Sequence, residues 1–213
     1  MSYESPTMQK VLLAIDRLST ALGKLFAWAI VLLTLSISWE VFSRYVLGKP
    51  HAWMLDLQIM LYGVLFMMAG AYTLAKNGHV RGDVLYGFFK PRTQATWDLI
   101  LYFVFFMPGV VALTWAGWTF FLESLAIREQ TFNADPIPVY PFKFFIPFSG
   151  ALLFLQGLVE IVRCIICLRT GEWPTRGEDV EEVDVDKLKA MVHVKDEDIA
   201  SLDQFVPTAG TRK

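Results

Sequence analysis

The chain has only two cysteines and three histidines among its 213 residues, and this scarcity limits its chemistry. Cys164 and Cys167 lie three positions apart among apolar neighbours, where we expect small buried side chains rather than a redox pair or half of a metal site. A four-thiolate site would need a second pair, which the sequence lacks. His51, His79 and His193 fall in three separate segments, so no two of them can ligate a haem within a bilayer.

Sequence motifs of enzymes and of self-contained carriers are also missing. Neither Gly-x-Ser-x-Gly nor His-Glu-x-x-His occurs, so we expect no enzyme. No internal repeat relates the two halves of the chain, which argues against an alternating-access site carried by this chain alone. We also see little charge inside the apolar segments and no polar cluster converging at their middle.

What the sequence does contain is long apolar segments. Hydrophobic residues make up 54% of the chain, and its mean hydropathy is +0.43. About 20 helical residues cross the roughly 30 Å hydrocarbon core of a bilayer, and four segments reach that length. The sequence therefore predicts an all-α integral membrane protein with four transmembrane helices. The predicted spans are Leu25 to Leu47, Leu55 to Ala75, Trp97 to Leu122 and Phe144 to Leu168.

Three regions follow from the distribution of charge and hydropathy. Residues 1–24 predict an amphipathic helix in the membrane surface, with a plain cytosolic helix as the alternative. Residues 25–168 form the transmembrane domain, whose first span we expect to stay in the mature protein. Residues 169–213 predict an acidic, mostly disordered tail, because more than half of the 21 acidic residues follow Gly171. The proposed apolar face of the first helix holds Val11, Leu12, Ile15, Leu18 and Leu22, and its polar face holds Lys10, Asp16, Arg17 and Lys24.

Lysine and arginine accumulate on one side of the predicted spans, which predicts that side to be cytoplasmic. Both termini should therefore be cytoplasmic. On the other side, the connection from Glu123 to Lys143 is rich in proline and should be fixed and irregular. Pro108 and Pro147 lie inside apolar segments and favour kinks. Small residues at helical spacing predict close helix contacts; they are Gly63 with Gly70, Gly109 with Ala112 and Ala116, and Gly150 with Gly157.

Glu40 and Arg44 are four positions apart near the end of the first span, which is the favourable order for an ion pair on one helix face. Asp56, at the start of the second span, is a second candidate partner for Arg44. The alternative is a snorkelling Arg44 and a solvated Asp56. Past the second span, the glycine-bearing loop around His79 predicts a hydrogen-bonding turn, because one histidine and one aspartate are too few for a metal site.

Taken in order, these motifs resemble one family. They are Glu40-Val-Phe-Ser-Arg44-Tyr45, Trp53 with Asp56, Gly70-Ala71-Tyr72, Gly78-His79-Val80-Arg81-x-Asp83, and Lys143-x-x-Ile146-Pro147. The ordered set resembles the small membrane subunit of tripartite ATP-independent periplasmic (TRAP) transporters, over about Leu25 to Leu168. The resemblance makes several residues candidates for structural or partner contacts. Those that match the family pattern are Arg44, Trp53, His79, Arg81, Asp83, Lys143 and Pro147. Two further candidates are Asp56, which stands in place of a more usual glutamate, and Glu40, which lies beside Arg44.

The resemblance implies a multi-pass subunit of the bacterial inner membrane. In such systems a periplasmic substrate-binding protein delivers a solute, usually a carboxylate, to a membrane pair that imports it with a sodium gradient. The resemblance places the substrate and sodium sites on the large membrane subunit, so we expect no cofactor and no nucleic acid on this chain. Its partners would be the large subunit, the binding protein and the phospholipid membrane. The rival interpretations are a stand-alone carrier or channel, and a membrane anchor for a redox enzyme.

Overall fold

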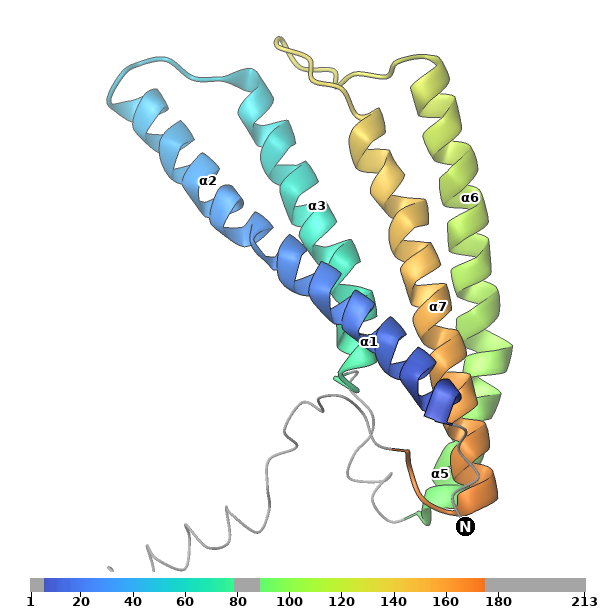
Figure 1. Ribbon diagram of the computed structural model, residues 1–213. Helices are drawn as coiled ribbons and strands as arrows, with labels where there is room; N and C mark the ends of the chain where they lie inside the picture. Colours follow the sequence, from blue (N-terminus) through green and yellow to red (C-terminus); the bar gives the residue numbers. More distant parts are fainter. Residues whose placement is uncertain (1–5, 79–88, 175–213) are drawn as a thin grey trace, which may run out of the picture. The chain divides into compact units, whose positions relative to one another are not determined.

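A computed structural model describes residues 6–78 and 89–174, and the chain folds there as an all-α protein (Figure 1). The acidic tail and the loop with His79, Arg81 and Asp83 lie outside the described residues. The helices are α1 (Pro6–Ala27), α2 (Ala29–Tyr45), α3 (Ala52–Ala75), α5 (Pro91–Leu101), the π-helical η1 (Tyr102–Phe106), α6 (Met107–Ala126) and α7 (Tyr140–Thr170).

In these described ranges, four segments are long and apolar enough to cross a membrane, as predicted. The first is longer than expected, because α1 and α2 together give an apolar helical segment from Met8 to Tyr45. Its 38 residues would measure about 57 Å as a straight helix, almost twice the hydrocarbon thickness. The helix runs through residue 24, and its one irregular position is Trp28. Figure 1 shows this long segment running obliquely across α3 and α7.

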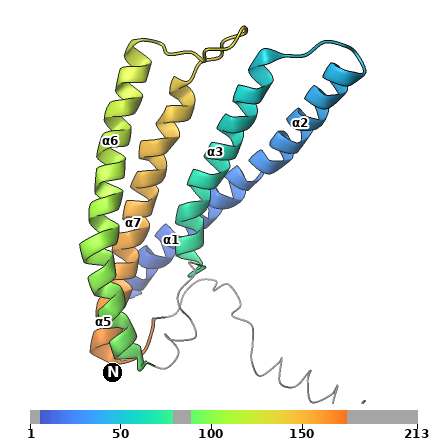
Figure 2. The ribbon, with the colours of Figure 1, turned by 180° about the vertical axis from the view of Figure 1, so that it is seen from behind.

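Helix α7 is the centre of the packing, because it contacts α1, α3, α5, η1 and α6. Thirteen of its 31 residues are buried, which makes it the most buried of the four spanning segments. One apolar cluster joins it to α3 through Leu152, Met68 and Ala71. Seen from behind, α7 lies between α3 and α6 (Figure 2).

Small residues allow these helices to approach closely, as predicted for three of the glycines. A Cβ added at Gly63 would meet the ring of Phe142 at 2.7 Å, and one at Gly157 would meet Phe106 at 2.6 Å. At Gly150 the added atom would lie 2.5 Å from Thr114 Oγ1. Gly109 differs, since nothing lies within 4 Å of an added Cβ. In the described part of the chain, α6 therefore has no close neighbour at this one position.

The two prolines inside apolar segments have different effects. Pro108 has no backbone N–H and so cannot donate an α-helical hydrogen bond. The five π-helical residues of η1 come shortly before it, and the backbone N–H of Met107 closes this stretch by donating to Tyr102 O. The third span is thus irregular where the sequence predicted a kink. Pro147 lies inside α7, which stays helical from Tyr140 to Thr170. The kink predicted there remains a prediction.

The connection between α6 and α7 is held by its own hydrogen bonds. Thr131 N donates to Ile137 O at 3.0 Å, and Val139 N donates to Glu129 O at 3.0 Å. A single antiparallel bridge joins Gln130 to Pro138. The proline-rich connection is therefore a narrow loop, and its backbone pairing agrees with the fixed connection that was predicted.

Candidate functional site

A cluster of buried polar side chains joins α1 to α7. Gln156 Nε2 donates to Asp16 Oδ1 at 2.8 Å, and Ser19 Oγ donates to Gln156 Oε1 at 3.0 Å. Arg163 donates one bond to Glu160 Oε1 at 2.6 Å and another to Asp16 Oδ2. All five residues are buried, with at most 6% of their surface exposed. We call these residues the central polar cluster.

Helical spacing brings the central polar cluster together. On α7, Gln156, Glu160 and Arg163 follow one another at intervals of four and three, so they share one face. On α1, Asp16 and Ser19 are three residues apart on the face that meets α7. Charges removed from water need close partners, and here each carboxylate receives a hydrogen bond from the guanidinium.

The central polar cluster corrects two expectations from the sequence. Asp16 was placed on the polar outer face of the first helix, but it is 6% exposed and paired with Arg163. No polar cluster was expected at the middle of the spans, whereas Gln156 lies near the middle of α7 and belongs to this cluster. The pair of Asp16 and Arg163 was missed because the two residues are 147 positions apart. The helical pattern of α1 alone does not show which partner Asp16 has.

The chemistry of the central polar cluster suits a clamp between two helices. The guanidinium of Arg163 already contacts two carboxylates, so it is not available to hold a carboxylate substrate. In the part of the chain that the structure describes, no group of three histidine, cysteine, aspartate or glutamate side chains is placed to hold a metal ion. The geometry therefore supports a structural role.

A second polar group lies at the turn between α2 and α3, with Glu40 as its acceptor. Arg44 donates to Glu40 Oε1 at 3.0 Å, which confirms the pair predicted from spacing. The backbone N of His51 lies 3.2 Å from Oε1, and His51 Nδ1 lies 3.1 Å from Oε2. Glu40 is buried, whereas the Arg44 side chain is 53% exposed. Sequence reasoning missed His51, although its place in the turn brings it back to Glu40.

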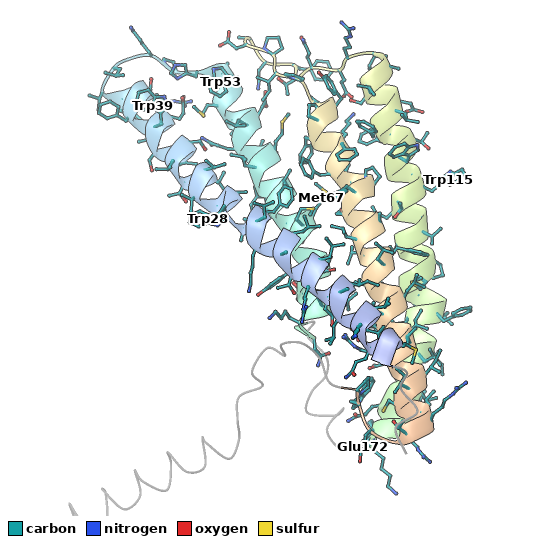
Figure 3. All side chains as sticks on the ribbon, viewed as in Figure 1. Trp28, Trp39, Trp53, Met67, Trp115 and Glu172 are labelled. Carbon is teal, nitrogen blue, oxygen red and sulfur yellow. The ribbon has the colours of Figure 1, made fainter. Side chains whose placement is uncertain are left out.

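Asp56 and Trp53 lie in the first turns of α3, near this group. Asp56 accepts a hydrogen bond from Asn133 Nδ2 at 2.5 Å, so its described partner is in the α6–α7 connection and not Arg44. The ring of Trp53 lies edge-on to His51, with 6.1 Å between centroids. Trp39 and Trp53 lie at the same end of the α2 and α3 pair (Figure 3).

Lys143 and Pro147 lie in the first turns of α7. Lys143 Nζ pairs with Glu129, and it also lies 3.7 Å from the centre of the Phe120 ring on α6. The hydrogen bond from Lys143 is the main cause that lowers the pKa of Glu129. Pro147 is buried one turn further along, against Gly117. Both residues thus hold α7 to α6 and the preceding connection.

The two cysteines lie at the other end of α7. Cys164 and Cys167 are 1% and 0% exposed, and both pack against Ala95 of α5. Cys167 Sγ lies 3.6 Å from Pro91 O. Their burial among apolar side chains agrees with the structural role expected from their neighbours.

An apolar groove runs between α6 and α7 on the outside of the bundle. Its volume is about 620 Å³, and Trp115, Trp118 and Phe148 are among the side chains that line it. The hydroxyl of Thr114 in its wall already donates to Val110 O at 2.7 Å. Figure 3 shows Trp115 projecting away from the bundle. This lining suits hydrocarbon or an apolar helix rather than a charged ligand.

Comparison with protein families gives a match. A family model described as "Tripartite ATP-independent periplasmic transporters, DctQ component" matches residues 33–167. The matched range begins in α2 and ends in the last turn of α7, so it includes Glu40 and Arg163 but not Asp16. No curated protein matches the chain.

Proposed function

Because the chain belongs to the family of DctQ components of tripartite ATP-independent periplasmic transporters, we propose that it is the scaffold subunit that supports the large transport subunit. The family match, which extends over parts of all four apolar segments, is the observation that carries this proposal. The family is one of transporter components and not of enzymes. Membership implies partnership with a large membrane subunit and a periplasmic binding protein.

We further propose that the complex imports small carboxylate solutes with a sodium gradient, and that the large subunit holds both ligands. Two features of this chain support that division of labour. Among the described residues, the most buried cation is Arg163, and it is paired with Asp16 and Glu160. The groove between α6 and α7 is lined almost wholly by apolar side chains. Neither feature suits a site for a carboxylate and a sodium ion.

The packing of the helices also supports a scaffold. Helix α7 holds the bundle together, while the most apolar stretches of the first and third spanning segments are only 11% and 6% buried within the chain. Outer faces of this kind meet either lipid or the helices of another subunit. The described residues thus offer a broad apolar surface that lipid or the helices of a partner can cover.

Reconstitution tests the division of labour. Vesicles would receive this chain alone, the large subunit alone, or both, together with the binding protein, a sodium gradient and radiolabelled candidate carboxylates. We expect no uptake with this chain alone and uptake with the pair. Sodium-driven, saturable uptake by this chain without the large subunit would refute the scaffold proposal and favour a stand-alone carrier.

We also propose an inner-membrane orientation with both termini cytoplasmic, supported by the asymmetry of lysine and arginine. Single cysteines at His51 and Ala134 should react with a membrane-impermeant reagent in intact cells, whereas cysteines at Asn77 and Ser201 should not. The native thiols are buried, so background labelling should be low. The reverse labelling pattern would show the opposite orientation.

A further inference from the structure

Helix α1 carries three basic residues along one line. Lys10, Arg17 and Lys24 are seven positions apart, which is close to two helical turns, and all three are exposed. We call them the basic stripe. Among the residues that the structure describes, no ion pair includes any of the three. The basic stripe is therefore a row of three exposed cations along α1, spaced about 10 Å apart.

An apolar line runs along the exposed side of α1, about 100° around the helix from the basic stripe. Val11, Leu18 and Leu25 each follow one of the basic residues, and they are 53%, 46% and 63% exposed. We call them the apolar stripe. Adjacent positive and apolar stripes on one exposed helix surface are typical of a segment at the boundary between headgroups and acyl chains.

Contacts on the opposite face of α1 determine which way the two stripes point. Leu12 packs against Val159 and Ile166 of α7, and Asp16 pairs with Arg163. Asp16 is the one acidic residue of α1, so no carboxylate of this helix lies on the exposed side. Because the helix is held on its inner face, the stripes face away from the bundle.

Packing against α3 shows at what depth the basic stripe lies. Gly23 of α1 lies against Tyr72, since a Cβ added there would be 2.5 Å from Tyr72 Cβ. The helices are antiparallel here, and the apolar span of α3 ends at Ala75, one turn beyond that contact. The end of this span is thus level with the part of α1 between Arg17 and Lys24. A lysine slightly deeper than the boundary extends its ammonium group toward the headgroups.

We propose that the basic stripe binds the phosphate groups of anionic phospholipids, with the apolar stripe inserted beside them among the upper acyl carbons. Charge complementarity selects an anionic headgroup, and the apolar stripe selects a lipid over a soluble anion. The acidic tail of this chain is a competing anion, and its truncation is therefore included in the test below. This inference depends on membrane insertion and is independent of what the transporter carries.

Lipid titration of the full chain, purified with its large subunit, tests the proposal. Phosphatidylglycerol or phosphatidylcholine would be added to the detergent-solubilised complex, and bound lipid counted by native mass spectrometry. The test variant combines Lys10→Gln, Arg17→Gln and Lys24→Gln. The matched control combines Lys90→Gln, Arg92→Gln and Arg169→Gln, which removes the same charge from three other exposed positions.

A basic residue near an anionic membrane surface contributes roughly fivefold to binding, so the test variant should lose phosphatidylglycerol affinity on the order of 100-fold. The control should retain most of it, and phosphatidylcholine binding should change little in either. Replacing Lys10 and Lys24 by arginine should keep the affinity, which separates charge from misfolding. An equal loss in test and control variants would overturn the proposal. A large gain of phosphatidylglycerol binding on truncation after Thr170 would overturn it too, because the tail would then be the occupant of the stripe.

Discussion

Helices α7 and α2 are both apolar, but the chain holds them in different ways. Thirteen of the 31 residues of α7 are buried, against three of the 17 residues of α2. The contacts of α7 come from five other elements, whereas those of α2 come mainly from α3. The hydropathy of a segment therefore does not show whether its surface faces protein or lipid. The distinction comes from small residues and from buried polar partners.

The polar groups on α7 and α2 also differ in how deeply they are buried. The central polar cluster on α7 is closed, since its charged side chains are all nearly inaccessible. The group at Glu40 is open on one side, because its arginine partner is half exposed. Substitutions in the two groups should thus have unequal costs, and each experiment below tests the contrast between α7 and α2 at one point.

The largest effect is expected from Arg163→Ala. The change leaves the carboxylates of Asp16 and Glu160 buried without their guanidinium, and breaking a buried charge pair typically costs about 3 to 5 kcal/mol. The thermal midpoint of the detergent-solubilised protein should fall sharply, while the exposed control Arg169→Ala should be near neutral. Equal midpoints for the two variants would mean that the central polar cluster does not stabilise the bundle.

Gly150→Leu should have the next largest effect. An added Cβ already lies 2.5 Å from Thr114 Oγ1 and 3.3 Å from Thr114 Cα, so a larger side chain must separate α6 from α7. Overpacking of this kind costs about 1 to 3 kcal/mol. Gly109→Leu is the matched control on α6, because it has no neighbour within 4 Å. A comparable loss of unfolding free energy in the control would contradict the packing argument.

Glu40→Ala should destabilise the turn between α2 and α3 more than Arg44→Ala does. Removing the buried acceptor leaves the backbone N–H of His51 without its carboxylate, at a cost of about 1 to 3 kcal/mol. Removing the exposed Arg44 should cost about 0 to 1 kcal/mol, as exposed ion pairs usually do. Chemical denaturation of both variants measures the difference. A larger loss for Arg44→Ala would mean that another subunit or lipid buries its side chain.

Acid should loosen the α6–α7 connection by a small amount. Because Lys143 lowers the pKa of Glu129 below 4.5, the ionised form favours the folded connection. This contribution is present above the unfolded pKa and is lost as pH falls through the lower folded pKa. The protection factors of the Thr131 and Val139 amides against hydrogen exchange should therefore decrease as the pH falls below about 4.5. The Glu129→Gln variant should show no such pH dependence at these amides; a wild-type response in it would assign the effect to another acid.

Local features of the chain were readable from the sequence. The four apolar segments predicted the spans, and the spacing of Glu40 and Arg44 predicted their ion pair, because both signals depend on residues close in sequence. Glycines at helical spacing predicted close contacts at Gly63, Gly150 and Gly157. The same pattern at Gly109 did not lead to a contact within the chain, since spacing identifies a compatible face but not its partner.

Features that depend on distant residues were not readable. Asp16 resembled the other polar residues of an amphipathic helix, and only the three-dimensional packing places Arg163 beside it. The length of the first apolar helical segment, which runs from Met8 to Tyr45, was not expected either, and the start of the membrane span at Leu25 remains a prediction. Lys24 interrupts the apolar sequence before Leu25, but lysine is a good helix former, so the helix continues through it.

The clamp between Asp16 and Arg163 also sets an order for biogenesis. Asp16 leaves the ribosome before Arg163, its partner, which follows 147 residues later. At about 5 to 20 residues per second, that interval is about 7 to 30 s. Until the last span is made, Asp16 must remain solvated or find a temporary partner in the translocation machinery. The contact between Asp16 and Arg163 can therefore form only late, after the whole transmembrane domain has been synthesised.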